Sequence, residues 1–178
     1  MNLLGTIERW GARPWRHVWT AALLGLAAAA LALHEARYGN FFTDDGFISL
    51  RYTARLLHGQ GLTWDDYERV EGYSNLLWVL LCAIPGAVGV DLVQGARGLG
   101  FAATIASFAA LVHIVRPATL RAGLAAVVAV AFMLVSSSIA VWSTGGLEPP
   151  LLLALVLWAL AIAGDERMPA QRRDLWVA

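Results

Sequence analysis

The chain has 178 residues, of which 58% are hydrophobic, and its mean hydropathy is +0.61. These values are too high for an ordinary soluble domain and predict a polytopic membrane protein. Thirteen arginines balance thirteen acidic residues, so no basic excess favours nucleic-acid binding. Because Cys82 is the single cysteine, the chain can form neither an intramolecular disulfide nor a cysteine metal cluster.

Four apolar windows have the length needed to cross a bilayer, roughly 17 to 25 residues. They are residues 17–33, 99–115, 122–141 and 147–163. A fifth apolar run, residues 76–90, is shorter and contains Pro85, which is typical of a re-entrant or partial helix. We therefore expect an all-α membrane protein with four transmembrane helices and one short dip, the last four of these five segments lying within residues 76–163.

Arginine placement predicts the orientation, because short cytoplasmic loops collect positive charge. Residues 1–16, the short loop around 116–121 and residues 164–178 hold eight of the thirteen arginines, so these segments are expected in the cytoplasm. The loop 34–75 carries more acid than base and is expected outside. A full crossing by residues 76–90 would reverse the later segments, which favours the dip. The eight arginines are Arg9, Arg13, Arg16, Arg116, Arg121, Arg167, Arg172 and Arg173.

The first apolar segment has a second interpretation. Arginines, a short apolar run and the small residues around Ala30 and Ala32 also resemble a cleavable signal peptide. The apolar run continues through Leu33, however, and the rest of the chain is itself expected in the membrane. A retained signal anchor is the simpler prediction.

The loop 34–75 contains an amphipathic pattern. Apolar residues from Phe47 to Leu57 recur at helical spacing, and polar residues follow another face, which predicts a helix on the membrane surface. Thr43 or Asp44 is expected to cap its start, and the glycines at 59 and 61 to end it. Ser74 or Asn75 is a comparable cap for the next apolar helix, with Trp78 expected at the membrane interface.

Asp44 and Asp45 are the candidate catalytic residues of this loop. The positive end of a helix keeps a nearby carboxylate ionised, and an ionised carboxylate can accept a proton from a reacting hydroxyl. The alternative is that the pair only caps the helix. The pair by itself does not separate these two roles.

The pair stands in a longer string that resembles the first external loop of the GT-C glycosyltransferases, in particular the family of the mycobacterial terminal arabinofuranosyltransferase. The order and spacing of the matching blocks are more specific than any one block, and the resemblance covers residues 19–163. The blocks are TDDGFISLRY at 43–52, GQGL at 59–62, ERVEGYSNLLW at 68–78 and STGGLE at 143–148.

The resemblance implies a membrane glycosyltransferase of the bacterial plasma membrane. Members of this superfamily transfer a sugar from a polyprenyl-phosphate carrier to a glycan acceptor on the outer side, and an acidic residue of the first loop acts as base. Carried onto this chain, Asp44 is the expected base, with Asp45 as its neighbour or substitute. Arabinofuranose is one candidate for the sugar, and an envelope glycan is the expected acceptor.

Positive charge is needed on the departing lipid phosphate, and arginine suits phosphate through its planar fork. Arg51 and Arg69, which lie inside the matching blocks, are the expected phosphate-binding residues. Arg55 is also available, although an arginine on an interfacial helix more often contacts lipid headgroups.

Glu71 and Tyr73 are expected to bind sugar hydroxyls or to order the loop. Glu148 follows two glycines and precedes Pro149 at the start of the last apolar segment. It is expected either to approach Asp44 from the opposite wall and bind the acceptor, or simply to start a helix. No histidine spacing indicates a metal site, so no cofactor is expected, and a divalent cation held by carboxylates is left open.

Two other functions remain as alternatives. The chain is a non-catalytic scaffold or lipid-binding protein if the carboxylates only cap the surface helix. A transporter fragment is less favoured, because transport predicts ionisable residues in mid-span and the four windows have almost none. Family members usually continue through many more helices, and residues 174–178 read like the start of another one, so we expect the chain to be the N-terminal part of a longer protein.

Overall fold

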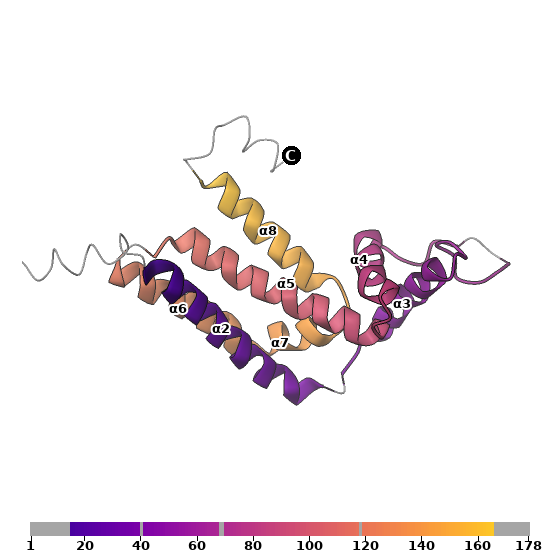
Figure 1. Cartoon of the computed structure of the whole chain (residues 1–178), viewed down its shortest axis with the longest axis horizontal. Helices are drawn as coiled ribbons and strands as arrows, with labels where there is room; N and C mark the ends of the chain where they lie inside the picture. The colour runs from indigo at the N-terminus through magenta and orange to yellow at the C-terminus, as the bar shows by residue number, and fades with distance from the viewer. Residues whose placement is uncertain (1–14, 40, 68–69, 118, 166–178) are drawn as a thin grey trace, which may run out of the picture.

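The computed structural model describes residues 15–39, 41–67, 70–117 and 119–165 (Figure 1). All regular secondary structure in these ranges is helical, as the composition predicts. The helices in chain order are α2 (Trp15–Glu35), the short 3-10 helix η2 (Ala36–Tyr38), α3 (Asp44–Leu57), α4 (Leu76–Ala87), α5 (Leu92–Val115), α6 (Leu120–Val135), α7 (Ser137–Thr144) and α8 (Pro149–Ala163). Arg69 and most of the two expected cytoplasmic ends lie outside the described residues.

The described residues contain fewer spans than the four predicted. Two helical segments are long and apolar enough to cross a membrane, His17–Tyr38 and Leu92–Val115, and α6 with α7 makes a third if the bent pair counts as one span. The window 147–163 forms α8, which has only 15 residues and a length of roughly 22 Å against a hydrocarbon core of about 30 Å. The expected dip at 76–90 is a 12-residue helix, α4, with Pro85 inside it.

The third predicted span, residues 122–141, is not a single straight helix. The chain bends by 67° between α6 and α7, and Ser136 at the break has extended backbone angles. Three consecutive serines begin at this point, and serine hydroxyls compete with the helical hydrogen bonds of the backbone. A window scored only by hydropathy passes over such a break.

Helix α5 lies at the centre of the bundle and packs against α2, α4, α6, α7 and α8 (Figure 1). It can do so because the residues on its buried sides are mostly small, and small residues let neighbouring helices approach closely. The closest approach is at Gly100, where an added Cβ would overlap the carbonyl oxygen of Ser143 in α7. The backbone of α7 therefore rests directly on α5.

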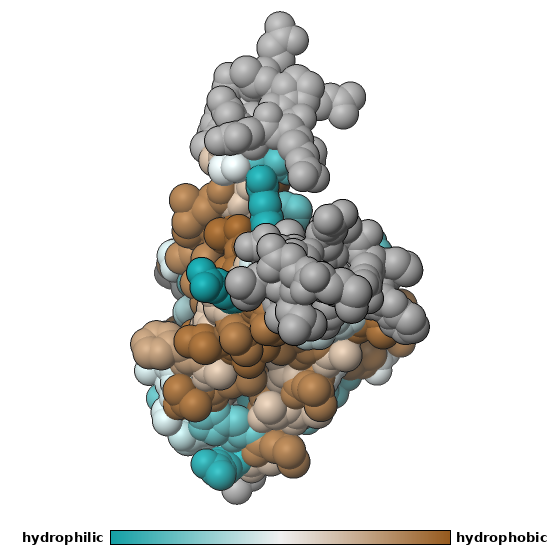
Figure 2. Space-filling view, turned by 90° about the vertical axis from the view of Figure 1, so that its left-hand side faces the viewer, coloured by the Kyte–Doolittle hydropathy of each residue, from teal (hydrophilic) through white to brown (hydrophobic). Residues whose placement is uncertain are grey.

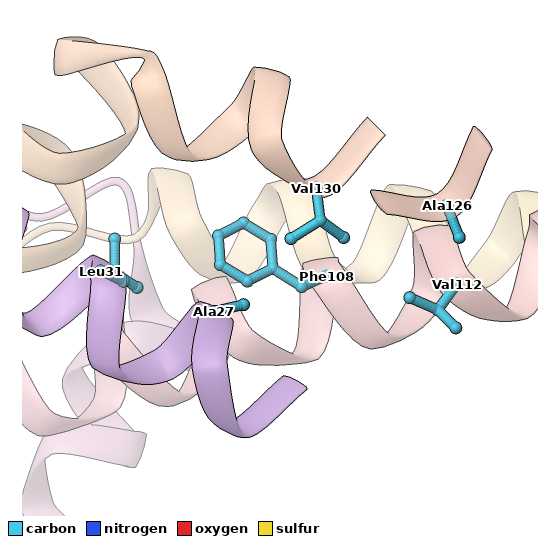
Figure 3. Close-up of a cluster of buried hydrophobic side chains, with 6 residues drawn as sticks. All are labelled: Ala27, Leu31, Phe108, Val112, Ala126 and Val130. Atoms are coloured by element: carbon cyan, nitrogen blue, oxygen red, sulfur yellow. The ribbon is translucent and has the colours of Figure 1, made fainter. Parts of the chain in front are cut away.

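A cluster of apolar side chains holds α2 and α6 against the C-terminal half of α5 (Figure 3). Phe108 of α5 points between the other two helices and is fully buried. Close packing of this kind supplies most of the attraction between helices in a membrane, where lipid is as apolar as the side chains. The cluster consists of Ala27 and Leu31 from α2, Phe108 and Val112 from α5, and Ala126 and Val130 from α6.

The outer faces of the bundle are apolar. Exposed leucine, valine and phenylalanine side chains occur on α2, α6 and α8, and hydrophobic residues dominate the middle of the face in Figure 2. A soluble monomer rarely exposes so large an apolar surface. Together with the long apolar helices, this surface indicates a membrane protein.

Helices α3 and α4 pack against each other beside one end of α5, apart from α2 and α6 (Figure 1). Leu50 of α3, Trp78 and Cys82 of α4, and Ala96 of α5 form a second buried cluster. The predicted surface helix is thus confirmed as a helix, and one of its faces packs on α4 and the start of α5. This packing positions the polar loop 58–75 at one end of the molecule.

We predict that Gly100→Ala destabilises the protein by about 1–3 kcal/mol, because the new methyl group has to displace the α7 backbone. The measurement is the unfolding temperature of the purified chain in detergent. Gly98→Ala is the matched control, since its Cβ meets nothing within 4 Å and alanine favours a helix over glycine. Equal unfolding temperatures for the two variants would rule out the close contact.

Candidate functional site

The site is built around the start of α3. Thr43 occupies the expected N-cap position, with extended backbone angles, but its side chain makes no capping hydrogen bond. Instead its backbone N–H donates to the carbonyl oxygen of Gly145 at 3.0 Å. The turn between α7 and α8 therefore sets where α3 begins.

Arg97 of α5 holds the segment that leads into α3. Its guanidinium donates to the carbonyl oxygens of Gly39 at 2.7 Å and Phe41 at 3.0 Å, and it lies over the ring of Phe42. These charge-assisted bonds anchor a stretch of chain that has no regular structure of its own. Arg97 is not among the site residues predicted from the sequence; its one signal there is a charge near the start of a long apolar helix.

Gly146 joins α4 to the same turn. It has a φ of +88°, and an added Cβ would overlap the ring of Phe42, so no other residue fits easily. Its carbonyl oxygen accepts a hydrogen bond from Trp78 Nε1 at 3.0 Å. Trp78 is only 1% exposed, so its side chain is packed inside the protein beside this turn, and its expected depth at the membrane interface stays a prediction.

Asn75, at the N-cap position of α4, links three elements through its side chain. The amide nitrogen donates to Glu148 Oε2 at 2.6 Å and lies 3.0 Å from Ser49 Oγ. The amide oxygen accepts from the same hydroxyl at 3.2 Å. The side chain of Asn75 was a candidate cap for α4. It makes no capping bond and instead holds Glu148, at the start of α8, against α3.

A polar cleft of about 260 Å³ opens beside this network. Asp45, Tyr73 and Glu148 line it together, so three of the predicted site residues meet in one place although they are distant in the sequence. Asp44 is exposed and does not line this cleft. The lining is completed by Ile48 and Ser49 of α3, Gly72, Ser74 and Asn75 before α4, and Leu147 before α8.

Glu148 has the expected position but a different neighbour. It stands at the N-cap position of α8, followed by Pro149 at N1, and makes no side-chain cap bond. Its carboxylate accepts a hydrogen bond from Asn75 and lines the same cleft as Asp45. The role of a simple helix start therefore does not account for its side chain.

Arg51 and Arg55 do not line the polar cleft. Arg55 is 6% exposed and forms an ion pair with Asp66 at 2.5 Å, so it orders the loop instead of reaching lipid headgroups. Arg51 is exposed, and its Nε donates to the carbonyl oxygen of Trp64 at 3.2 Å. Arg69 lies outside the described residues.

Tyr52 supports the loop from the middle of α3. Its hydroxyl donates to the carbonyl oxygen of Val70 and accepts from the N–H of Gly72, both at 2.8 Å. Its fully buried ring packs edge-on against Tyr73 and near Trp64. Tyr73 is therefore held at the cleft by an aromatic contact, whereas Glu71 is exposed and outside the cleft lining.

The chemistry available at the cleft is that of two carboxylates, a phenol, two serine hydroxyls and an amide. Among the described residues no group of three histidine, cysteine or acidic side chains is arranged to hold a metal ion. Such a lining can bind a polyhydroxylated molecule and remove a proton from one of its hydroxyls. Protein-family models, curated proteins and solved structures yield no match to this chain.

We predict that Asn75→Asp lowers the stability of the protein by about 1–3 kcal/mol, because it replaces a donor with a second carboxylate against Glu148. Adding Glu148→Gln restores a donor and an acceptor in swapped positions and should recover most of the loss. The unfolding temperatures of the two single variants and the double variant test this coupling. Strictly additive effects would mean that the two side chains do not meet.

Proposed function

We propose that this chain is a membrane glycosyltransferase module that moves a sugar from a polyprenyl-phosphate donor to a glycan hydroxyl. The observation that carries the proposal is the shared cleft of Asp45 and Glu148. Two carboxylates from helices far apart in the sequence meet there at one end of a bundle with apolar outer faces. A lipid-linked sugar and a polar acceptor need this combination of an apolar scaffold and a polar cleft.

Asp45 is the better-supported base of the adjacent pair. It is the second residue of α3, where the helix end favours a negative charge, and it lines the cleft whereas Asp44 does not. In the proposed step the carboxylate takes the proton of the acceptor hydroxyl while that oxygen forms a bond to the anomeric carbon of the donor. The bond from the anomeric carbon to the lipid phosphate breaks, and the phosphate leaves with the electron pair.

Glu148 and Tyr73 are proposed to bind and orient the acceptor. One carboxylate oxygen of Glu148 accepts a hydrogen bond from Asn75, and the carboxylate can accept a further bond from a sugar hydroxyl. Tyr73 is held by Tyr52, so its ring and hydroxyl add little conformational cost on binding. Orientation of the attacking hydroxyl is a large part of what such a site can contribute to the rate.

The donor phosphate is proposed to lie toward Arg51. Arg51 follows Asp45 by six residues on α3, which is roughly 9 Å along the helix axis. Its Nε donates to the carbonyl oxygen of Trp64, and its terminal nitrogens are proposed to bind the anionic group. This arrangement puts the departing charge and the base at different points of one helix.

The test is transfer of a labelled sugar from a panel of polyprenyl-phosphate donors to envelope glycan, in membranes of cells that express the gene. Asp45→Asn is expected to lower the transfer rate by roughly 10²- to 10⁴-fold, with an unchanged amount of protein in the membrane. Asp44→Asn is expected to have the smaller effect of the two.

Asp91→Asn is the matched control, because Asp91 caps α5 by accepting from Gln94 N–H and an asparagine oxygen can accept the same bond. Full activity of Asp45→Asn would remove Asp45 from the reaction. Loss in Asp44→Asn alone would transfer the role of base to Asp44. Absence of transfer from every donor would favour the non-catalytic scaffold.

A further inference from the structure

A second cavity lies at the other end of α3 and has no part in the proposed reaction. We call it the loop pocket; its volume is about 500 Å³, nearly twice that of the polar cleft. Most of its wall comes from the loop after α3. The lining residues are Arg55, Gln60, Gly61, Leu62, Thr63, Asp65, Asp66 and Tyr67.

The wall of the loop pocket is held by a buried charge. The Arg55 guanidinium donates to Thr63 Oγ1 at 2.9 Å, to the carbonyl oxygen of Asp65 at 2.8 Å and to Asp66 Oδ1 at 2.5 Å. Asp65 Oδ1 in turn accepts from the N–H of Tyr67 at 2.9 Å. A loop that is fixed at so many points presents a formed surface and loses little entropy when a ligand binds.

Tyr67 lines the loop pocket and is unusually exposed for an aromatic residue. Its side chain is 94% exposed, so it contributes almost no packing to the fold. An aromatic ring that is held at its backbone and left bare beside polar groups offers an apolar face and a hydroxyl. Sugar rings have the complementary surface, with C–H groups on one face and hydroxyls at the edge for Gln60 and the carboxylate of Asp66.

The charges of the lining argue against other small ligands. The charged residues of the described lining are two aspartates and one arginine, and an excess of carboxylates disfavours a phosphate or another anion. Asp66 is already paired with Arg55, and no cluster of three potential metal ligands occurs among the residues that the structure describes. A neutral polyhydroxylated ligand is not repelled by the carboxylates and does not need a cluster of metal ligands.

The loop pocket and the polar cleft lie along one face of α3. Asp45, Tyr52 and Arg55 follow at spacings of seven and three residues, which places them on the same side of a helix. The rings of Tyr73 at the cleft and Trp64 beside the loop pocket pack on either side of Tyr52. From Asp45 to Arg55 the helix rises roughly 15 Å, a span suited to an oligosaccharide and too long for one sugar.

We propose that the loop pocket is a carbohydrate-binding site that holds the inner residues of an oligosaccharide acceptor, whose terminal hydroxyl lies at the polar cleft. Carbohydrate binding by the loop pocket stands on its own contacts. The identification of the bound sugar as the acceptor rests on the proposed function. Tyr67 supplies the stacking surface, and Gln60 and Asp66 bind hydroxyls.

The experiment is a titration of the purified full chain in detergent, followed by tryptophan fluorescence and by saturation-transfer NMR. The probes are neutral linear hexasaccharides of arabinofuranose, mannose and glucose, each with its monosaccharide. At least one hexasaccharide is expected to bind and its monosaccharide to bind far more weakly. Tyr67→Ala should weaken this binding roughly tenfold, while Tyr67→Phe, which keeps the ring, should retain most of it.

The controls separate this inference from the proposed reaction. Gln60→Ala should weaken binding, whereas Gln94→Ala, which removes an exposed amide near the start of α5, should not. Asp45→Asn should lose transfer but keep the part of the hexasaccharide binding that depends on Tyr67 and Gln60. Binding that is unaffected by Tyr67→Ala and Gln60→Ala, or absent for all three hexasaccharides, would overturn the inference and leave the transfer assay to judge the reaction. Binding abolished by a chelator would overturn it in favour of a cation site.

Discussion

The contact on which the rest of the structure depends is the approach of the α7 backbone to Gly100 of α5. It exists because α5 carries hydrogen where any other residue has a Cβ. Because α7 packs there, the turn after α7 presents two carbonyl oxygens to α3 and α4. Gly145 accepts the N–H of Thr43, and Gly146 accepts the indole of Trp78, so α3 and α4 are both positioned by one turn.

The candidate site is made by three segments: the start of α3, the residues that lead into α4, and the start of α8. Polar bonds join them, with Asn75 between Ser49 and Glu148 at the centre. In an environment of low dielectric such bonds are strong when complete and costly when one partner is missing. The network of Ser49, Asn75 and Glu148 therefore joins α3, α4 and the start of α8 around the cleft that Asp45 also lines.

Helix α3 organises the polar end of the molecule along its length. Asp45 near its first turn lines the polar cleft, Tyr52 in the middle fixes the loop, and Arg55 in its last turn forms the wall of the loop pocket. A buried arginine at this position costs desolvation energy unless it is fully bonded, and its bonds to the loop meet that cost. These three side chains link the polar cleft, the loop and the loop pocket along one helix.

The sequence by itself determined the helical class, the surface helix at Asp44–Leu57 and the short helix containing Pro85, because periodicity, caps and composition act locally. It also selected Asp45, Tyr73 and Glu148, through a pattern and not through geometry. Only the tertiary structure decided that these three share a cleft, that Arg55 is buried, and that the apolar window after Ala122 bends at Ser136. Those outcomes depend on what each segment packs against, and hydropathy along the chain carries no record of a partner that lies tens of residues away.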